Sequence, residues 1–138
     1  RNWIMGLETA LKNTEKNILQ EKCMDFSVKI VNLYQSLCSD RHEFVMSKQM
    51  LKCGTSIGTN VREAKRAQSK PDFLSKLSIA LKEADETQYW LELMSKTGYI
   101  NENDFKGLFS DSEELVKILV SITKTIKSQI KTSRNSNS

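Results

Sequence analysis

The chain has 138 residues, a formal net charge of +4 and a sequence pI of about 9.0. That length is typical of one domain and is sufficient for a hydrophobic core without disulfides or metals. One proline and five glycines indicate long helices with few turns. The mildly basic balance permits a nucleic-acid or acidic-protein partner without requiring one.

The three cysteines, Cys23, Cys38 and Cys53, form no CxxC pair. An odd number of well-separated cysteines predicts reduced thiols and a cytoplasmic location. The apolar run near the N-terminus is only a few residues long. It is too short for a secretory leader or a membrane span, so no membrane association is expected.

Apolar residues recur at helical spacing in the first half of the chain. The first predicted helix covers residues 14–39 and ends at the turn-prone, charged segment 39–43. The second predicted helix covers residues 43–68. Its apolar face includes Phe44, Met50 and Ile57.

The second half of the chain predicts two further helices. The third covers residues 70–96, with Ser69 as its N-cap, Pro71 in its first turn and Gly98 just past its end. The fourth begins near Glu102, is loosened around Gly107, and continues strongly to about residue 131. Its acids come first and its lysines last, which complements the helix dipole.

Four helices joined by short loops predict an all-α fold, an up-down-up-down antiparallel four-helix bundle. The bundle is expected to be one domain over residues 14–134. An N-terminal extension, residues 1–13, would precede it, and residues 135–138 would form a frayed tail.

The segment 54–58, GTSIG, allows two interpretations, a phosphate-binding loop or a closely packed helix face. A P-loop needs a preceding strand and a lysine directly after its second glycine, and this segment has neither. A glycine inside a helix costs about 1 kcal/mol relative to alanine, which close helix packing can offset. Gly54 and Gly58 are therefore predicted to lie at a helix-packing or oligomer interface.

Tyr89 and Trp90 lie together in the middle of the third predicted helix. Neighbouring helical positions point about 100° apart, so one ring can face the bundle while the other faces outward. The preferred interpretation is a packing or subunit contact, since such aromatics are typical of interfaces. Stacking on nucleic-acid bases is the alternative.

A set of cations on the second helix and at the start of the third is the candidate nucleic-acid site. Its members are Lys48, Lys52, Arg62, Lys65, Arg66 and Lys70. Between Phe44 and Lys70 only Glu63 opposes them. The alternative is a solvated face neutralised by acids of the third helix, namely Glu83, Asp85, Glu86 and Glu92. The fourth helix adds further lysines and carries no acid after Glu114.

No pattern of catalytic or metal-binding residues is present. His42 is the only histidine, and it lies in a predicted loop. Carboxylate–histidine metal sites in helical bundles need a Glu-x-x-His motif from each of two helices. No catalytic triad can be assembled from this sequence either. We therefore expect no catalytic residue, no metal and no cofactor.

Three segments resemble the 23S rRNA intervening-sequence protein family, a group of small bacterial four-helix bundle proteins. They read FSVKIVNLYQSL, SKQMLKCGTSIGTNVREAKRAQSKPDF and KLSIALKEADETQYWLELM. The resemblance covers about residues 18–130 and is strongest in the second and third helices. Cys53 stands where the family commonly has serine, and Arg62 where it commonly has a small residue; the added charge favours a binding role.

The resemblance implies a left-handed antiparallel bundle that assembles as a homo-pentamer. It also implies a relation to the accessory variability proteins of diversity-generating retroelements, basic pentameric barrels that bind nucleic acid and a reverse transcriptase. We therefore expect a non-enzymatic, homo-oligomeric assembly or adaptor module that binds RNA or DNA weakly and without sequence specificity. The alternative is a protein-binding scaffold with no nucleic-acid affinity.

Overall fold

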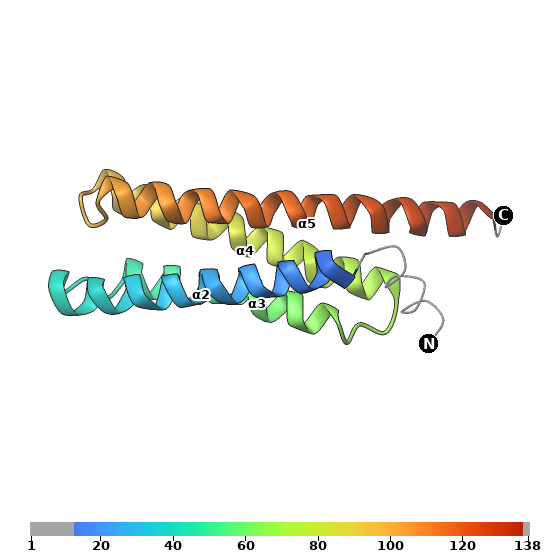
Figure 1. The fold of residues 1–138 in the computed structure, drawn as a ribbon, viewed down its shortest axis with the longest axis horizontal. Helices are drawn as coiled ribbons and strands as arrows, with labels where there is room; N and C mark the ends of the chain where they lie inside the picture. The colour runs from blue at the N-terminus through green and yellow to red at the C-terminus, as the bar shows by residue number, and fades with distance from the viewer. Residues whose placement is uncertain (1–12, 137–138) are drawn as a thin grey trace.

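The computed structural model describes residues 13–136, with side chains from residue 18 onward, and consists of four helices (Figure 1). These are α2 (Asn13–Arg41), α3 (Met46–Ala64), α4 (Lys70–Lys96) and α5 (Glu102–Ser136). Short loops join them, so successive helices run antiparallel, and the described part of the chain contains no strand. The predicted all-α four-helix bundle is confirmed. The expected N-terminal extension falls almost wholly outside the described residues.

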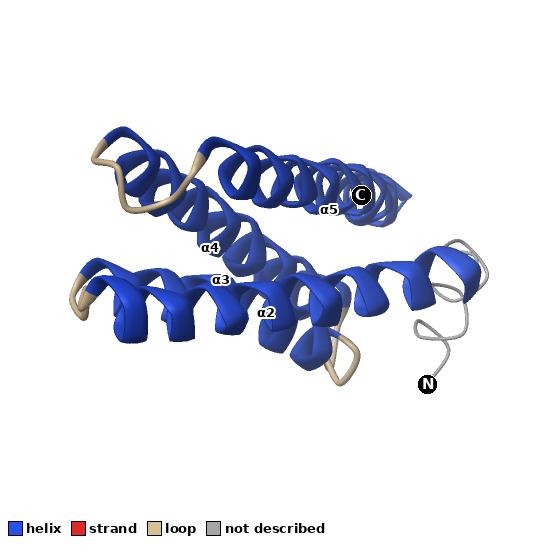
Figure 2. Ribbon diagram, turned by 60° about the vertical axis from the view of Figure 1, so that its left-hand side comes forward, coloured by secondary structure: helices blue, strands red, loops and turns tan. Residues whose placement is uncertain are grey.

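Each helix packs beside two others. α3 contacts α2 and α4, and α5 contacts α4 and, less extensively, α2. Consequently α3 and α5 lie diagonally across the bundle, with their outer faces directed away from each other (Figure 2). Two ion pairs bridge the sparser α2–α5 contact: Lys22 to Glu114 at 2.6 Å and Lys29 to Asp111 at 2.7 Å.

The core is built from apolar residues at three- and four-residue spacing on all four helices. Its fully buried members include Ile30, Met50, Ile57, Leu91, Leu119 and Ile126. Thr87 and Ser112 are buried polar exceptions, and both are hydrogen-bonded. The Thr87 hydroxyl donates to the Glu83 carbonyl, and the Gln88 amide donates to the Ser112 hydroxyl. These bonds offset the cost of burying polar groups.

The two ends of α4 follow the local sequence signals. The Ser69 hydroxyl accepts a hydrogen bond from the backbone N–H of Asp72, as an N-cap does. At the other end Gly98 has a φ of 82°, a left-handed conformation that glycine adopts without strain. The predicted range of this helix is therefore the observed one.

α3 is shorter than predicted, because it begins at Met46 and ends at Ala64 rather than covering residues 43–68. Glu43 lies before the helix and is buried. Its carboxylate accepts hydrogen bonds from the backbone N–H groups of Val45, Met46 and Ser47. Glu43 thus satisfies the free N–H groups of the first turn, and the helix starts after it.

α5 is continuous through Gly107, where the sequence predicts a loosened helix, and it runs to Ser136. The glycine is exposed, while its neighbours Phe105 and Leu108 pack against the core. One exposed glycine destabilises a helix by about 1 kcal/mol. Burial of one large apolar side chain stabilises the fold by more than that. Packing on both sides of Gly107 therefore keeps the helix intact.

Candidate nucleic-acid interface

Five of the six candidate cations lie on the solvent-facing side of α3 and its C-terminal end. This α3 basic face consists of Lys48, Lys52, Arg62, Lys65 and Arg66, all of them exposed. The opposite side of the helix packs into the core through Met50, Ile57 and Val61. Lys70 is half-buried at the first residue of α4. Helical spacing explains the placement of Lys48, Lys52 and Arg62, while Lys65 and Arg66 lie in the turn after α3.

The acids of α4 reach only part of the α3 basic face. Burial raises the pKa of Glu83, as does the neighbouring Glu86, while Lys52 and Lys82 lower it. Glu83 and Glu86 also act on the thiol of Cys53. α3 and α4 are antiparallel, so these acids lie level with the first half of α3. The charge of Lys52 is therefore partly offset.

The C-terminal half of α3 lies level with the start of α4, where acids are scarce. Between residues 70 and 82 the only acid is Asp72, and its carboxylate accepts the backbone N–H of Gln68. Lys65 donates to the amide oxygen of Gln20, a neutral partner, at 2.8 Å. Across residues 18–136, no ion pair involves any of the six candidate cations. Glu63 follows Arg62 in the chain and Glu21 follows Gln20, so acids lie near this end, but none of them forms an ion pair with Arg62, Lys65 or Arg66.

Gly54 and Gly58 both face α2. A Cβ atom on Gly54 would lie 3.0 Å from two side-chain carbons of Ile30, and one on Gly58 would lie 3.4 Å from the Cβ of Cys23. The small residues around Gly58 leave a shallow groove of about 260 Å³ between the helices. Arg62 lies on its rim, next to Thr59. The GTSIG segment therefore brings α2 and α3 together and leaves a mostly apolar groove beside the α3 basic face.

Tyr89 and Trp90 take opposite environments. The Trp90 ring is half-buried against the core, whereas Tyr89 is 59% exposed. Their rings meet edge to face with centroids 5.3 Å apart. The buried indole N–H of Trp90 has no hydrogen-bond partner within the described residues. Tyr89 is the member of the pair available for an external contact.

The structure shows a second basic surface. In the sequence its residues are visible only as additional cations on the last helix. Lys127, Lys131 and Arg134 line an open groove between the end of α5 and the start of α4. Their i, i+4, i+7 spacing is visible in the sequence. Their neighbours on α4 are not, because they depend on how the two helices pack.

Metal-ligating and nucleophilic side chains are the other chemical groups within residues 13–136. No group of three His, Cys, Asp or Glu residues in this range could hold a metal ion. Burial raises the pKa of Cys23 to about 12 and that of Cys53 to about 11, which makes both poor nucleophiles. None of the four helices carries an apolar stretch long enough to cross a bilayer.

Comparison with known proteins agrees with the fold. The model of the family described as 23S rRNA-intervening sequence protein matches residues 15–121. A crystal structure of a protein of unknown function from the S23 ribosomal protein family of Bacteroides thetaiotaomicron is 53% identical in sequence. The match covers 80% of this chain and 98% of that one, with a TM-score of 0.79. A search of the curated proteins found no match.

Proposed function

Because the chain belongs to the 23S rRNA-intervening sequence protein family, we propose that it is a non-enzymatic, homo-oligomeric assembly or adaptor module. It binds RNA or DNA weakly and without sequence specificity, through phosphate contacts. The contacts come from Lys48, Lys52, Arg62, Lys65, Arg66 and Lys70, with the C-terminal half of α3 contributing most.

The observation that carries this proposal is the absence of ion pairs at the C-terminal half of the α3 basic face within residues 18–136. Arg62 and Arg66 are exposed and four residues apart, and neither takes part in an ion pair with any described residue. Arg62 lies in the last turn of α3 and Arg66 in the turn that follows it, so their like charges repel each other at the end of the helix. Binding to phosphates offsets that repulsion and releases counterions from the nucleic acid. A homo-oligomer repeats the face on each subunit and raises the avidity of weak contacts.

The test is fluorescence anisotropy with a labelled structured RNA and a random duplex DNA, at about 50 and about 200 mM salt. We expect binding that weakens steeply with salt. In an Arg62→Gln/Arg66→Gln variant, the slope of log affinity against log salt for duplex DNA should decrease by about 0.9 per lost contact.

The matched control is Lys48→Gln/Lys52→Gln, which removes the same charge from the half of α3 that faces the acids of α4. Its effect should be smaller, because Glu83 already offsets Lys52. The absence of binding at about 50 mM salt would exclude a nucleic-acid role. Equal effects of the two variants on the salt slope would show that the acids of α4 do not reduce the contribution of Lys48 and Lys52 to binding.

Exposed apolar residues support self-assembly and also keep open the alternative of a protein-binding scaffold. Met24 and Val28 lie four residues apart on α2 and are 53% and 51% exposed. Phe44 and Val45, in the loop before α3, are more exposed still. Clustered apolar surface of this kind marks protein contacts. We assign Met24 and Val28 to the subunit interface of a pentamer, and leave Phe44, Val45 and Tyr89 for a protein partner.

A further inference from the structure

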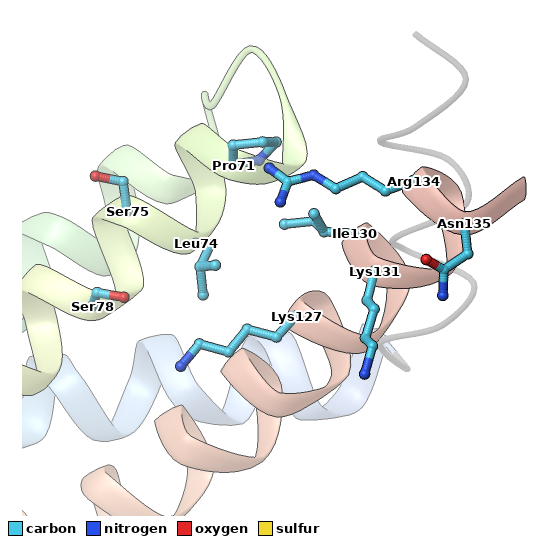
Figure 3. Close-up of a pocket in the computed structure, with 9 residues that line it drawn as sticks. All are labelled: Pro71, Leu74, Ser75, Ser78, Lys127, Ile130, Lys131, Arg134 and Asn135. Carbon is cyan, nitrogen blue, oxygen red and sulfur yellow. The ribbon is translucent and has the colours of Figure 1, made fainter. Parts of the chain in front are cut away.

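A second basic surface lies at the end of α5, beside the start of α4. The end of α5 passes the start of α4 and forms an open groove of about 630 Å³, here called the α4–α5 groove (Figure 3). Lys127, Lys131 and Arg134 come from α5, while Pro71 and Leu74 come from α4. The match to the family ends at residue 121, so the α5 wall of this groove lies beyond it.

Among the described residues that line the groove, no acid opposes the three cations. Lys127, Lys131 and Arg134 share one side of α5 and span about 10 Å along it, at a rise of about 1.5 Å per residue. α5 carries no acid after Glu114. Among residues 18–136, none of the three cations takes part in an ion pair. The groove therefore attracts an anionic ligand that is extended along the helix.

The floor of the groove is apolar. Leu74 and Ile130 are half-buried, pack against the core and still line the open space. In Figure 3 they lie between Arg134, which extends toward Pro71, and Lys127 on the other side. Phosphate groups bind to the cations but make no favourable contact with this apolar floor. A ligand that carries both phosphates and a flat, weakly polar group uses the whole surface.

We propose that the α4–α5 groove binds single-stranded nucleic acid. Its phosphates contact Lys127, Lys131 and Arg134, and an unstacked base lies on Leu74 and Ile130. This inference rests on the proposed nucleic-acid function and adds to it a second surface and a preference for single strands. A duplex keeps its bases stacked and paired, so it can reach the cations but not the apolar floor.

The experiment compares three labelled ligands by anisotropy: dT12, a twelve-unit abasic phosphodiester chain and a duplex DNA. The intact protein should bind dT12 at least about threefold more tightly than the abasic chain, because only dT12 can place a base on the floor. In a Lys127→Gln/Arg134→Gln variant, dT12 should bind about tenfold more weakly, with a salt slope lower by about 0.7 per lost contact.

The matched control is Lys117→Gln/Lys124→Gln, which removes the same charge from exposed positions of the same helix outside the groove. Its effect on dT12 should be less than about threefold. A Ser78→Glu variant places a carboxylate at the groove wall with a good helix former. It should weaken the binding of dT12 and of the abasic chain alike, because the carboxylate repels the phosphates of both, while the far-UV circular dichroism stays unchanged.

The outcomes separate this inference from the proposed function. If groove and control variants weaken dT12 binding equally, the groove is not the site, and duplex binding by the Arg62→Gln/Arg66→Gln variant still tests α3. If polyglutamate of twelve residues displaces dT12 at equal concentration, the groove recognises charge alone and the inference fails. If the intact protein binds neither dT12 nor duplex at about 50 mM salt, both proposals fail.

Discussion

Gly54 and Gly58 lie four residues apart on α3 yet contact α2 with different closeness. Ile30, the neighbour of Gly54, is fully buried and β-branched, so its rotamer is stiff within a helix. The neighbour of Gly58 is at an ordinary van der Waals distance. Gly107 on α5 has no neighbouring side chain within 4 Å of the place that a Cβ atom would take. The three glycines thus span tight, ordinary and open surroundings.

Alanine at these positions should change the free energy of unfolding in a graded way. Gly107→Ala should stabilise the protein by up to about 1 kcal/mol, through helix propensity alone. Gly54→Ala gains the same propensity but must displace Ile30, and overpacking costs about 1–3 kcal/mol. We expect a net loss of about 1 kcal/mol, measured from urea midpoints. Stabilisation of Gly54→Ala equal to that of Gly107→Ala would contradict the close contact.

The buried thiols make stability depend on alkaline pH. Burial raises the pKa of Cys53 from 9.0 to about 11. Above pH 9 the unfolded thiol loses its proton while the folded one keeps it, so the native state binds more protons and stability falls as pH rises. The fall should reach about 1 kcal/mol per thiol near pH 10. Cys53→Ala should flatten this part of the urea-unfolding profile, and an unchanged slope would contradict the assignment.

At the scale of the elements, local sequence signals predicted the ends of α4 correctly. The start of α3 and the continuity of α5 depend on tertiary contacts instead. Ser69 and Gly98 act on their own backbone, so the sequence shows where α4 begins and ends. The sequence predicts a loosened helix at Gly107 because glycine disfavours helices. It does not show that the neighbours of Gly107 pack against the core and keep the helix continuous. Glu43 carries helical spacing with the residues after it, but its carboxylate satisfies their N–H groups from outside the helix.

Glu43 should therefore stabilise α3 as its terminal hydrogen-bond acceptor. Glu43→Ala leaves the N–H groups of Val45, Met46 and Ser47 without this carboxylate and should cost about 1–3 kcal/mol. Glu43→Gln keeps one accepting oxygen and should cost less. Hydrogen exchange of the Met46 and Ser47 amides should speed up in the alanine variant. Exchange as slow as in the unsubstituted protein would show that the cap contributes nothing.

At the scale of the whole molecule, the exposure of the candidate cations follows from helical spacing, but their electrostatic surroundings do not. The sequence raised the question of whether the acids of α4 neutralise α3. The structure answers it for one half of α3 only: Glu83 acts on Lys52, whereas the start of α4, level with the other half, holds no acid except Asp72. It also places the basic end of α5 beside the start of α4, the helix that lies between α3 and α5.

The exposed apolar side of α2 leads to a prediction about assembly. Met24 and Val28 are half-exposed in the single chain, so charged substitutions there leave the core intact. If this side forms the subunit contact, Met24→Glu/Val28→Glu buries two carboxylates at the interface and should dissociate the oligomer. Light scattering should then change from about five times the chain mass of 15.8 kDa to the monomer mass.

The control for that experiment adds two carboxylates elsewhere on the surface. Thr125 and Ser128 are exposed on α5, and a Thr125→Glu/Ser128→Glu variant should keep the mass of the unsubstituted protein. Dissociation of both variants would attribute the effect to net charge rather than to α2. A monomeric unsubstituted protein would overturn the proposed assembly, and the apolar residues of α2 would then be a surface for a different protein.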